Sequence, residues 1–148
     1  MAMTDPRPAT LAKAAELERF YQELNELYHD VARTCGLSDS AFDILYALMM
    51  HDGLTQKQLR EGSFMTKQTV SSSVSRLIAD GLVETAGGGR GATVSLSAAG
   101  TALVRERLRP VLAAECRAIE RLSPADQDEL LRLLNVYRTA LRAELSAL

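Results

Sequence analysis

The segment TKQTVSSSVSRLIADGLVE, residues 66–84, constrains the fold more than any other part of the chain. Four serines crowd its middle, although serine is a mediocre helix former because its hydroxyl competes for backbone hydrogen bonds. Apolar residues nevertheless recur at three- and four-residue steps, at Val70, Val74, Leu77 and Ile78. This is the stripe of a helix with one buried side, so we expect an amphipathic helix that starts at a Thr66 cap and ends before Gly81.

The face opposite this stripe is polar, short and free of acidic side chains. It holds Gln68, Thr69, Ser72, Ser75, Arg76 and Ala79, with Ser71 and Ser73 at its margins. A helix that enters a DNA major groove, about 12 Å wide, needs small side chains near the backbones and a few long ones that reach base edges. Gln68 can bond adenine bidentately, and Lys67 or Arg76 can meet guanine or phosphate. DNA reading is one interpretation, and an ordinary solvated helix face is the other.

Helical patterns with clear start and stop signals precede this segment. Apolar periodicity predicts a long helix over 10–35, which Gly36 ends. A second helix follows a Ser38 cap and ends at Gly53. Thr55 and Gln58 have the spacing of a capping box, which predicts a short helix over 56–61.

A strand pair and two further helices follow. The sequence predicts strands at 82–84 and 93–96, joined by a glycine-rich tip, and hence a two-stranded hairpin. Ser97 caps a helix that runs to 122, with a kink or break near Arg109 because Pro110 lies inside it. Ser123-Pro124 starts a last helix with apolar positions at Leu130, Leu134, Tyr137, Leu141 and Leu145.

This order of elements predicts a mainly α fold with a small β-hairpin wing. Two short helices joined by a tight turn, followed by a hairpin, make a winged helix-turn-helix, which we place at 38–97. The helices at 8–36 and 98–148 are long and apolar enough to need partners, which suggests an intertwined dimer. We expect residues 1–148 to form a single domain with these dimerisation helices around the winged lobe.

Net charge is unevenly distributed along the chain. The formal total of −2 argues weakly against nucleic acid as a partner. Residues 1–54 hold 4 basic and 9 acidic residues, net −5, whereas residues 55–96 hold 5 and 3, net +2; residues 97–148 hold 8 and 7, net +1. The predicted DNA-reading part is therefore the most basic third.

Several other kinds of site are disfavoured. Gly87 to Ala92 match GxGxxA, but a strand follows where a dinucleotide site needs a helix. His29 and His51 form no metal-binding pair, and no nucleophile stands with a base, so we expect no metal site, no cofactor and no enzyme activity. No long apolar run or signal peptide is present, so we expect a cytoplasmic protein without membrane association.

The stretch LTQKQLREGSFMTKQTVSSSVSRLIADGLVE, followed by a hairpin and VSLSAAG, resembles the MarR family of bacterial transcription regulators. In that family a Leu-Thr pair opens the first helix of the turn, a Ser/Thr-rich helix begins near a KQTV-like tetrad, and a GLV step enters the wing. The wing is left through V-x-L-T-x-x-G, where this chain has Ser97 in place of threonine. The resemblance is specific over 55–100 and extends to the outer helices by length and order.

The resemblance implies a homodimeric, DNA-binding repressor or activator on a roughly palindromic operator. Many family members respond to small aromatic or phenolic molecules and others to thiol oxidation. By analogy, the DNA contacts come from Thr55, Thr66, Lys67, Gln68, Thr69, Ser71, Ser72, Ser73 and Arg76, with Arg90 in the wing. Gly88 stands where family wings commonly carry an aspartate, so Arg90 is less preorganised for the minor groove.

Two alternatives stay open at this point. Winged helices and long apolar helices also build protein complexes without DNA, so a helical protein-interaction module is one. A thiol-redox-sensing regulator that uses Cys35 or Cys116 is the other, although a buried structural cysteine is the commoner case. The residues that would bind an effector carry no motif, and we assign none.

Overall fold

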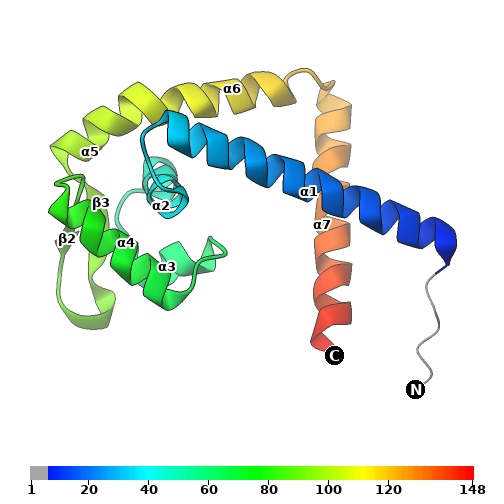
Figure 1. Ribbon diagram of the computed structural model, residues 1–148, viewed down its shortest axis with the longest axis horizontal. Helices are drawn as coiled ribbons and strands as arrows, with labels where there is room; N and C mark the ends of the chain where they lie inside the picture. The colour runs from blue at the N-terminus through cyan, green and yellow to red at the C-terminus, as the bar shows by residue number, and fades with distance from the viewer. Residues whose placement is uncertain (1–6) are drawn as a thin grey trace. The chain divides into compact units, whose positions relative to one another are not determined.

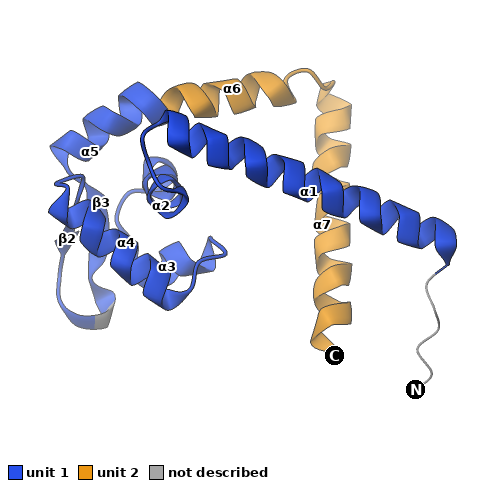
Figure 2. Cartoon of the chain, viewed as in Figure 1, with its two compact units in different colours: residues 1–108 blue, residues 109–148 orange. Residues whose placement is uncertain are grey.

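The computed structural model describes residues 7–148, apart from the side chain of Arg90 (Figure 1). The chain divides into two compact units, residues 1–108 and residues 109–148 (Figure 2). The first unit contains α1 (Pro8–Thr34), α2 (Asp39–Met50), β1 (Leu54–Thr55), α3 (Gln56–Glu61), α4 (Lys67–Ala79), β2 (Val83–Ala86), β3 (Thr93–Leu96), α5 (Ala98–Leu103) and a π-helical turn (Val104–Leu108). The second unit contains α6 (Arg109–Ile119) and α7 (Pro124–Ser146).

Side-chain caps start the helices where the sequence predicts them. The hydroxyls of Ser38, Thr66, Ser97 and Ser123 each accept a hydrogen bond from a backbone N–H of the following first turn. Thr55 and Gln58 form the expected capping box of α3. Each cap satisfies a backbone donor that the helix itself leaves unpaired, so these starts are local properties of the sequence.

The core of the first unit lies between α2, α4, the sheet and the π-helical turn. Its most completely buried side chains are Ile44, Leu45, Leu48, Val70, Val74, Leu77, Val94 and Leu108. Three of the four residues predicted for the apolar stripe of α4 are therefore core residues. Ile78 is different, because it remains 43% exposed at the edge of the stripe near the end of the helix.

The sheet has three strands rather than the two of the expected hairpin. β3 lies in the middle and pairs antiparallel with β2 on one side and β1 on the other, in the order β1-β3-β2. Leu54 pairs with Val94 and Thr55 with Thr93. Two residues show no periodicity, so β1 is recognisable only once the chain returns with β3 beside it.

A close approach of α5 to the entry of β2 closes the base of the wing. The Ser97 hydroxyl donates to the carbonyl of Gly81 at 2.6 Å, and the Ser97 N–H donates to the carbonyl of Leu82 at 3.1 Å. A Cβ placed on Gly100 would lie 1.9 Å from the same Leu82 carbonyl oxygen. Only glycine fits this position, which explains the last residue of the VSLSAAG motif.

The predicted break in the fifth helix takes the form of a change in helix type. The π-helical turn Val104–Leu108 ends directly before α6, and Pro110 is the second residue of α6. Proline has no N–H for the regular helical bond and its ring crowds the carbonyl four residues earlier. A wider π-helical turn before it relieves that conflict without ending the helix.

Candidate nucleic-acid interface

The polar face of α4 is exposed to solvent, as the helical periodicity of the sequence predicts. Figure 1 shows α4 between α3 and the hairpin of β2 and β3. The exposed residues of this face are Lys67, Gln68, Thr69, Ser71, Ser72, Ser75 and Arg76, together with the cap Thr66. Because the opposite side is anchored in the core, the face is rigid and free to meet a partner.

Hydrogen bonds within α4 explain how the helix tolerates its serines. The Ser72 hydroxyl donates to the carbonyl of Thr69 at 3.1 Å, and the Ser75 hydroxyl donates to that of Ser71 at 2.9 Å. Their oxygens still face solvent with free lone pairs. Each hydroxyl can donate to a phosphate by rotating about its C–O bond. At an exposed site, exchanging the backbone carbonyl for another acceptor costs little free energy.

Ser73 lies differently from the other predicted contact residues. It is half-buried, and its hydroxyl donates to the hydroxyl of Ser40 in α2 at 2.8 Å. Its position along the helix places it at the margin of the polar face, and α2 packs against that margin and partly covers it. Its observed role is therefore to join α2 to α4.

The side chain of Thr55 is also engaged within the protein. It is half-buried and its hydroxyl oxygen accepts from the Gln58 N–H at 3.2 Å, while the Thr55 N–H donates to Gln58 Oε1 at 2.9 Å. These two bonds complete the capping box, so Thr55 defines where α3 begins.

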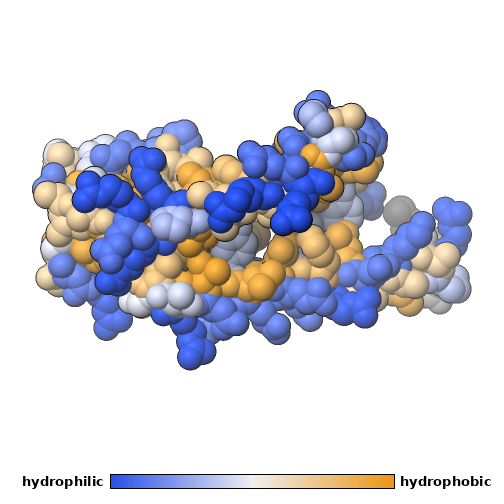
Figure 3. All heavy atoms as spheres, turned by 90° about the horizontal axis from the view of Figure 1, so that it is seen from above, coloured by the Kyte–Doolittle hydropathy of each residue, from blue (hydrophilic) through white to orange (hydrophobic). Residues whose placement is uncertain are grey.

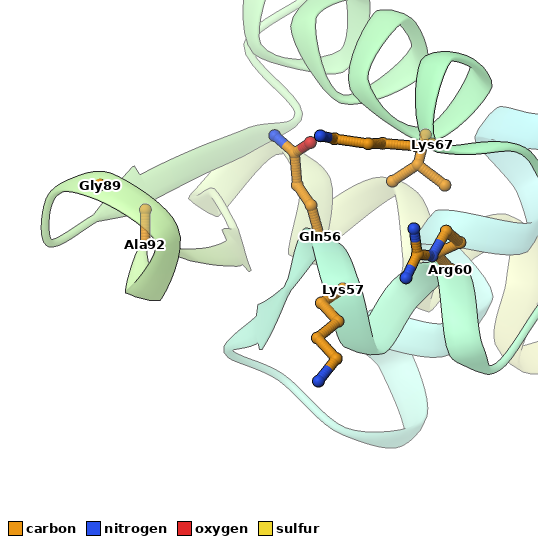
Figure 4. Close-up of a pocket in the computed structure, with 7 residues that line it drawn as sticks. Gln56, Lys57, Arg60, Lys67, Gly89 and Ala92 are labelled. Carbon is orange, nitrogen blue, oxygen red and sulfur yellow. The ribbon is translucent and has the colours of Figure 1, made fainter.

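A basic cavity of about 410 Å³ lies between α3, the start of α4 and the wing (Figure 4). It is lined by Gln56, Lys57, Arg60, Lys67, Val70, Gly89 and Ala92. In Figure 4 the side chains of Gln56 and Lys67 extend from the two helices toward the same space, while Lys57 extends away from it. None of the seven lining residues is acidic.

Three lining residues of the basic cavity escaped the sequence prediction, namely Gln56, Lys57 and Arg60. They lie on α3, which shows no DNA-reading pattern of its own, and only the fold brings them beside Lys67. The net positive charge of residues 55–96 was the one signal that pointed to them. Lys57 Nζ lies 3.7 Å from a carboxylate oxygen of Glu61, an exposed pair of little strength.

The wing tip follows a tight backbone path. Gly87 and Gly89 have φ values of +82° and +64°, which favour glycine, and residues 89–91 form a single 3₁₀ turn. Arg90 belongs to that turn, but its side chain lies outside the part of the structure that is described. The predicted minor-groove contact of Arg90 stays a prediction.

The two cysteines have different surroundings. Cys35 is buried, its thiol donates to the carbonyl of Arg107 at 3.6 Å, and the Arg107 guanidinium donates back to the Cys35 carbonyl at 2.9 Å. Burial raises the pKa of the Cys35 thiol, and the charge of Arg107 opposes the rise in part. Cys116 in α6 is exposed.

The described residues form neither a metal-binding cluster nor a membrane-spanning helix. Between residues 7 and 148, no three His, Cys, Asp or Glu side chains are grouped so as to hold a metal ion. His29 instead pairs with Asp39, at 2.9 Å from Nδ1 to a carboxylate oxygen. No helix in this part of the chain is long and apolar enough to cross a membrane.

The fold and the exposed helix define a winged helix-turn-helix protein, and comparison with known proteins shows which proteins it is similar to. The sequence model of the MarR family matches residues 36–91. None of the curated proteins compared matches the chain.

Solved structures extend the match to the outer helices. NMB1585, a MarR family regulator from Neisseria meningitidis, has a TM-score of 0.81 at 20% identity, over 90% of this chain and 96% of that one. SPO1453, a MarR family transcriptional regulator from Silicibacter pomeroyi, has a TM-score of 0.66 at 28% identity, over 86% and 90%. Bordetella bronchiseptica BpsR has a TM-score of 0.66 at 22% identity, over 90% and 99%.

These findings confirm the resemblance drawn from the sequence. Residues 36–91 carry the sequence pattern of the MarR family, and the chain has the winged-helix fold of MarR family transcription regulators.

Proposed function

We propose that this chain is a sequence-specific DNA-binding transcription regulator that acts as a homodimer on a palindromic operator. The observation that carries the proposal is the exposed polar face of α4, backed by an apolar stripe of which Val70, Val74 and Leu77 are buried. Residues 62–79 contain no aspartate or glutamate, so the turn and the whole of α4 repel no phosphate. A helix of this kind fits a major groove with its polar face toward the bases.

In this proposal, different residues contact the DNA bases and the DNA phosphate backbone. Gln68 and Arg76 are exposed and long enough for bidentate bonds to base edges, while hydroxyls of α4 meet phosphates. The basic cavity adds Arg60 and Lys67 for the neighbouring backbone. Because each neutralised phosphate releases counterions, operator affinity is expected to fall steeply with salt concentration.

The homodimer is inferred from apolar surface that a single chain leaves uncovered (Figure 3). α7 has no buried residue along its 23 residues. Its exposed apolar stripe consists of Leu130, Leu134, Tyr137, Leu141 and Leu145. A helix with so broad an apolar side is stable in water only against a partner, and a second copy presents two α4 helices to successive major grooves.

A small aromatic or phenolic effector is proposed to release the operator. The dimer then has two conformations that differ in the spacing of its two α4 helices. One spacing fits adjacent major grooves and the other does not, and the effector binds the second conformation more tightly. Support comes from BpsR, whose DNA binding is described as regulated by 6-hydroxynicotinic acid. The burial and raised pKa of Cys35 work against a redox form of this control at that residue.

The test is binding of the purified protein to the DNA upstream of its own gene, measured by electrophoretic shift and by anisotropy over a range of salt concentrations. Gln68→Ala and Arg76→Ala are each expected to weaken specific binding about tenfold or more while the dimer stays folded. Arg105→Ala serves as the matched control, because Arg105 is an exposed arginine of the π-helical turn and belongs to neither α4 nor the basic cavity.

Unchanged affinity in both α4 variants would remove this helix as the reader. A stable dimer with no affinity for any duplex would instead favour a helical protein-interaction module.

A further inference from the structure

Phe64 is the most exposed aromatic side chain among the described residues. It lies in the turn between α3 and α4, and its relative exposure is 110%. Phenylalanine usually buries its ring, which contributes to stability in proportion to the area removed from water. No described part of the chain covers this ring.

The turn holds Phe64 outward by hydrogen bonds on either side of it. The Ser63 hydroxyl donates to the carbonyl of Arg60 at 3.4 Å and accepts from the Met65 N–H at 3.3 Å. Met65 is half-buried, and Thr66 caps α4 directly after it. The ring is therefore presented two residues before the cap of the helix that we propose to read DNA.

The charges around this ring suit a polyanion. Arg60 and Lys67 stand on either side of the turn in sequence and line the same basic cavity. The nearest acidic residue in sequence is Glu61, one of whose carboxylate oxygens lies 3.7 Å from Lys57 Nζ on the same helix. An exposed apolar ring on a turn that Arg60 and Lys67 flank in sequence suits the wall of a major groove, where phosphates surround base edges.

We propose that Phe64 is a specificity-determining residue that packs against the methyl group of a thymine in each half-site. The inference rests on the proposed function and refines it. A phenylalanine ring has no hydrogen-bond donor or acceptor, so it cannot read the polar pattern of a base pair. The one apolar group that a base presents in the major groove is the thymine 5-methyl, and covering it gives sequence preference without a hydrogen bond.

The first experiment selects sites from a random duplex pool with the full-length wild type, Phe64→Ser and Phe64→Leu. The wild type and Phe64→Leu are expected to require thymine at one position in each half-site, and Phe64→Ser is expected to lose that preference alone. Because the ring is fully exposed, Phe64→Ser is expected to keep the melting temperature and dimer mass of the wild type.

The second experiment replaces that thymine by uracil, which removes only the methyl group. Wild-type affinity is expected to fall about fourfold for each thymine replaced, as for one buried methylene. Phe64→Ser is expected to bind both operators equally.

Three results overturn the inference. The first is a thymine preference that persists in Phe64→Ser. The second is a Phe64→Ser affinity that lies below the wild-type affinity by the same factor on the thymine operator and on the uracil operator. The third is a changed dimer mass of Phe64→Ser, which would show that the ring contacts protein instead. If Gln68→Ala and Arg76→Ala still weaken operator binding in that case, only the role of Phe64 fails. If the wild type selects no site at all, the proposed function fails with it.

Discussion

The winged lobe and α7 treat their apolar side chains in opposite ways. In the lobe, α2 and α4 bury Ile44, Leu45, Val74 and their neighbours almost completely. α7 is richer in leucine than the lobe, yet it buries none of its residues within a single chain. The lobe therefore buries its apolar side chains inside the first unit, with the help of Leu108 of the π-helical turn, whereas α7 leaves its apolar side chains exposed, as the proposed dimer requires.

The largest effect is expected from breaking the surface of α7. Leu134→Ser combined with Leu141→Ser removes two neighbours of its apolar stripe, four side chains in a dimer. Full burial of a leucine side chain is worth roughly 1.5–3 kcal/mol, and Leu134 and Leu141 have 41% and 40% of their surface left to bury. Over four side chains the dimer dissociation constant should therefore rise about a hundredfold or more. Sedimentation and light scattering over a concentration series measure it.

A matched variant on the other side of α7 controls for the introduction of serine. Val136→Ser with Thr139→Ser changes residues that helical periodicity places away from the stripe, and both are exposed. An equal loss of dimer in the control would show that α7 is not divided into a pairing side and a solvent side.

The close packing of α5 against the entry of β2 is tested next by adding one carbon atom. Gly100→Ala places a Cβ 1.9 Å from the carbonyl oxygen of Leu82, where a backbone atom cannot move easily. We expect a loss of about 3 kcal/mol in the free energy of unfolding, measured by urea denaturation. Gly88→Ala in the wing is the control, because no atom lies within 4 Å of its Cβ and its φ is −129°. Equal stability of the two variants would contradict the close approach.

A smaller effect compares the two cysteines, one in each unit. Burial raises the pKa of Cys35 and covers its sulfur, so both the thiolate fraction and access are reduced, while Cys116 is exposed. At pH 7.5 we expect iodoacetamide to label Cys116 at least about ten times faster than Cys35, because Cys35 reacts only after local opening. Peptide mass spectrometry assigns the sites.

The labelling should be repeated on the Leu134→Ser, Leu141→Ser chain, so that a dimer interface does not shield Cys116. Similar rates at both cysteines there would show that the end of α1 opens readily.

The smallest effect concerns a carboxylate at the edge of the lobe. Burial raises the pKa of Asp43 above its ordinary value of 3.8, and the charge of Asp39 adds to the rise. The folded state therefore holds this proton more tightly than the unfolded state, so the free energy of unfolding falls as the pH rises from about 3.8 through the raised pKa.

Asp43→Asn removes that dependence. Since the side chain is partly exposed and screened, the variant should gain only a few tenths of a kcal/mol at pH 7 and nothing below about pH 3. Urea denaturation at the two pH values measures this, and a variant less stable than the wild type at pH 7 would contradict it.

The sequence by itself determined where most elements begin and what kind they are. Thr66 caps α4, Thr55 and Gln58 make the capping box, and Gly81 has a positive φ after α4. These signals act between residues at most four apart, so they hold whatever the rest of the chain does. The exposed polar face of α4 was predictable for the same reason, because helical period and an apolar stripe fix which side is wet.

Only the tertiary structure decided which surfaces meet. It added β1 to the sheet, turned Ser73 toward Ser40, left Ile78 partly exposed, and brought Arg60 of α3 beside Lys67 of α4. Each of these outcomes depends on residues far apart in the chain or on which neighbour reaches a given side of a helix. Periodicity predicts which face of an element is apolar. Which other elements pack against that face depends on how all the elements bury their apolar sides together.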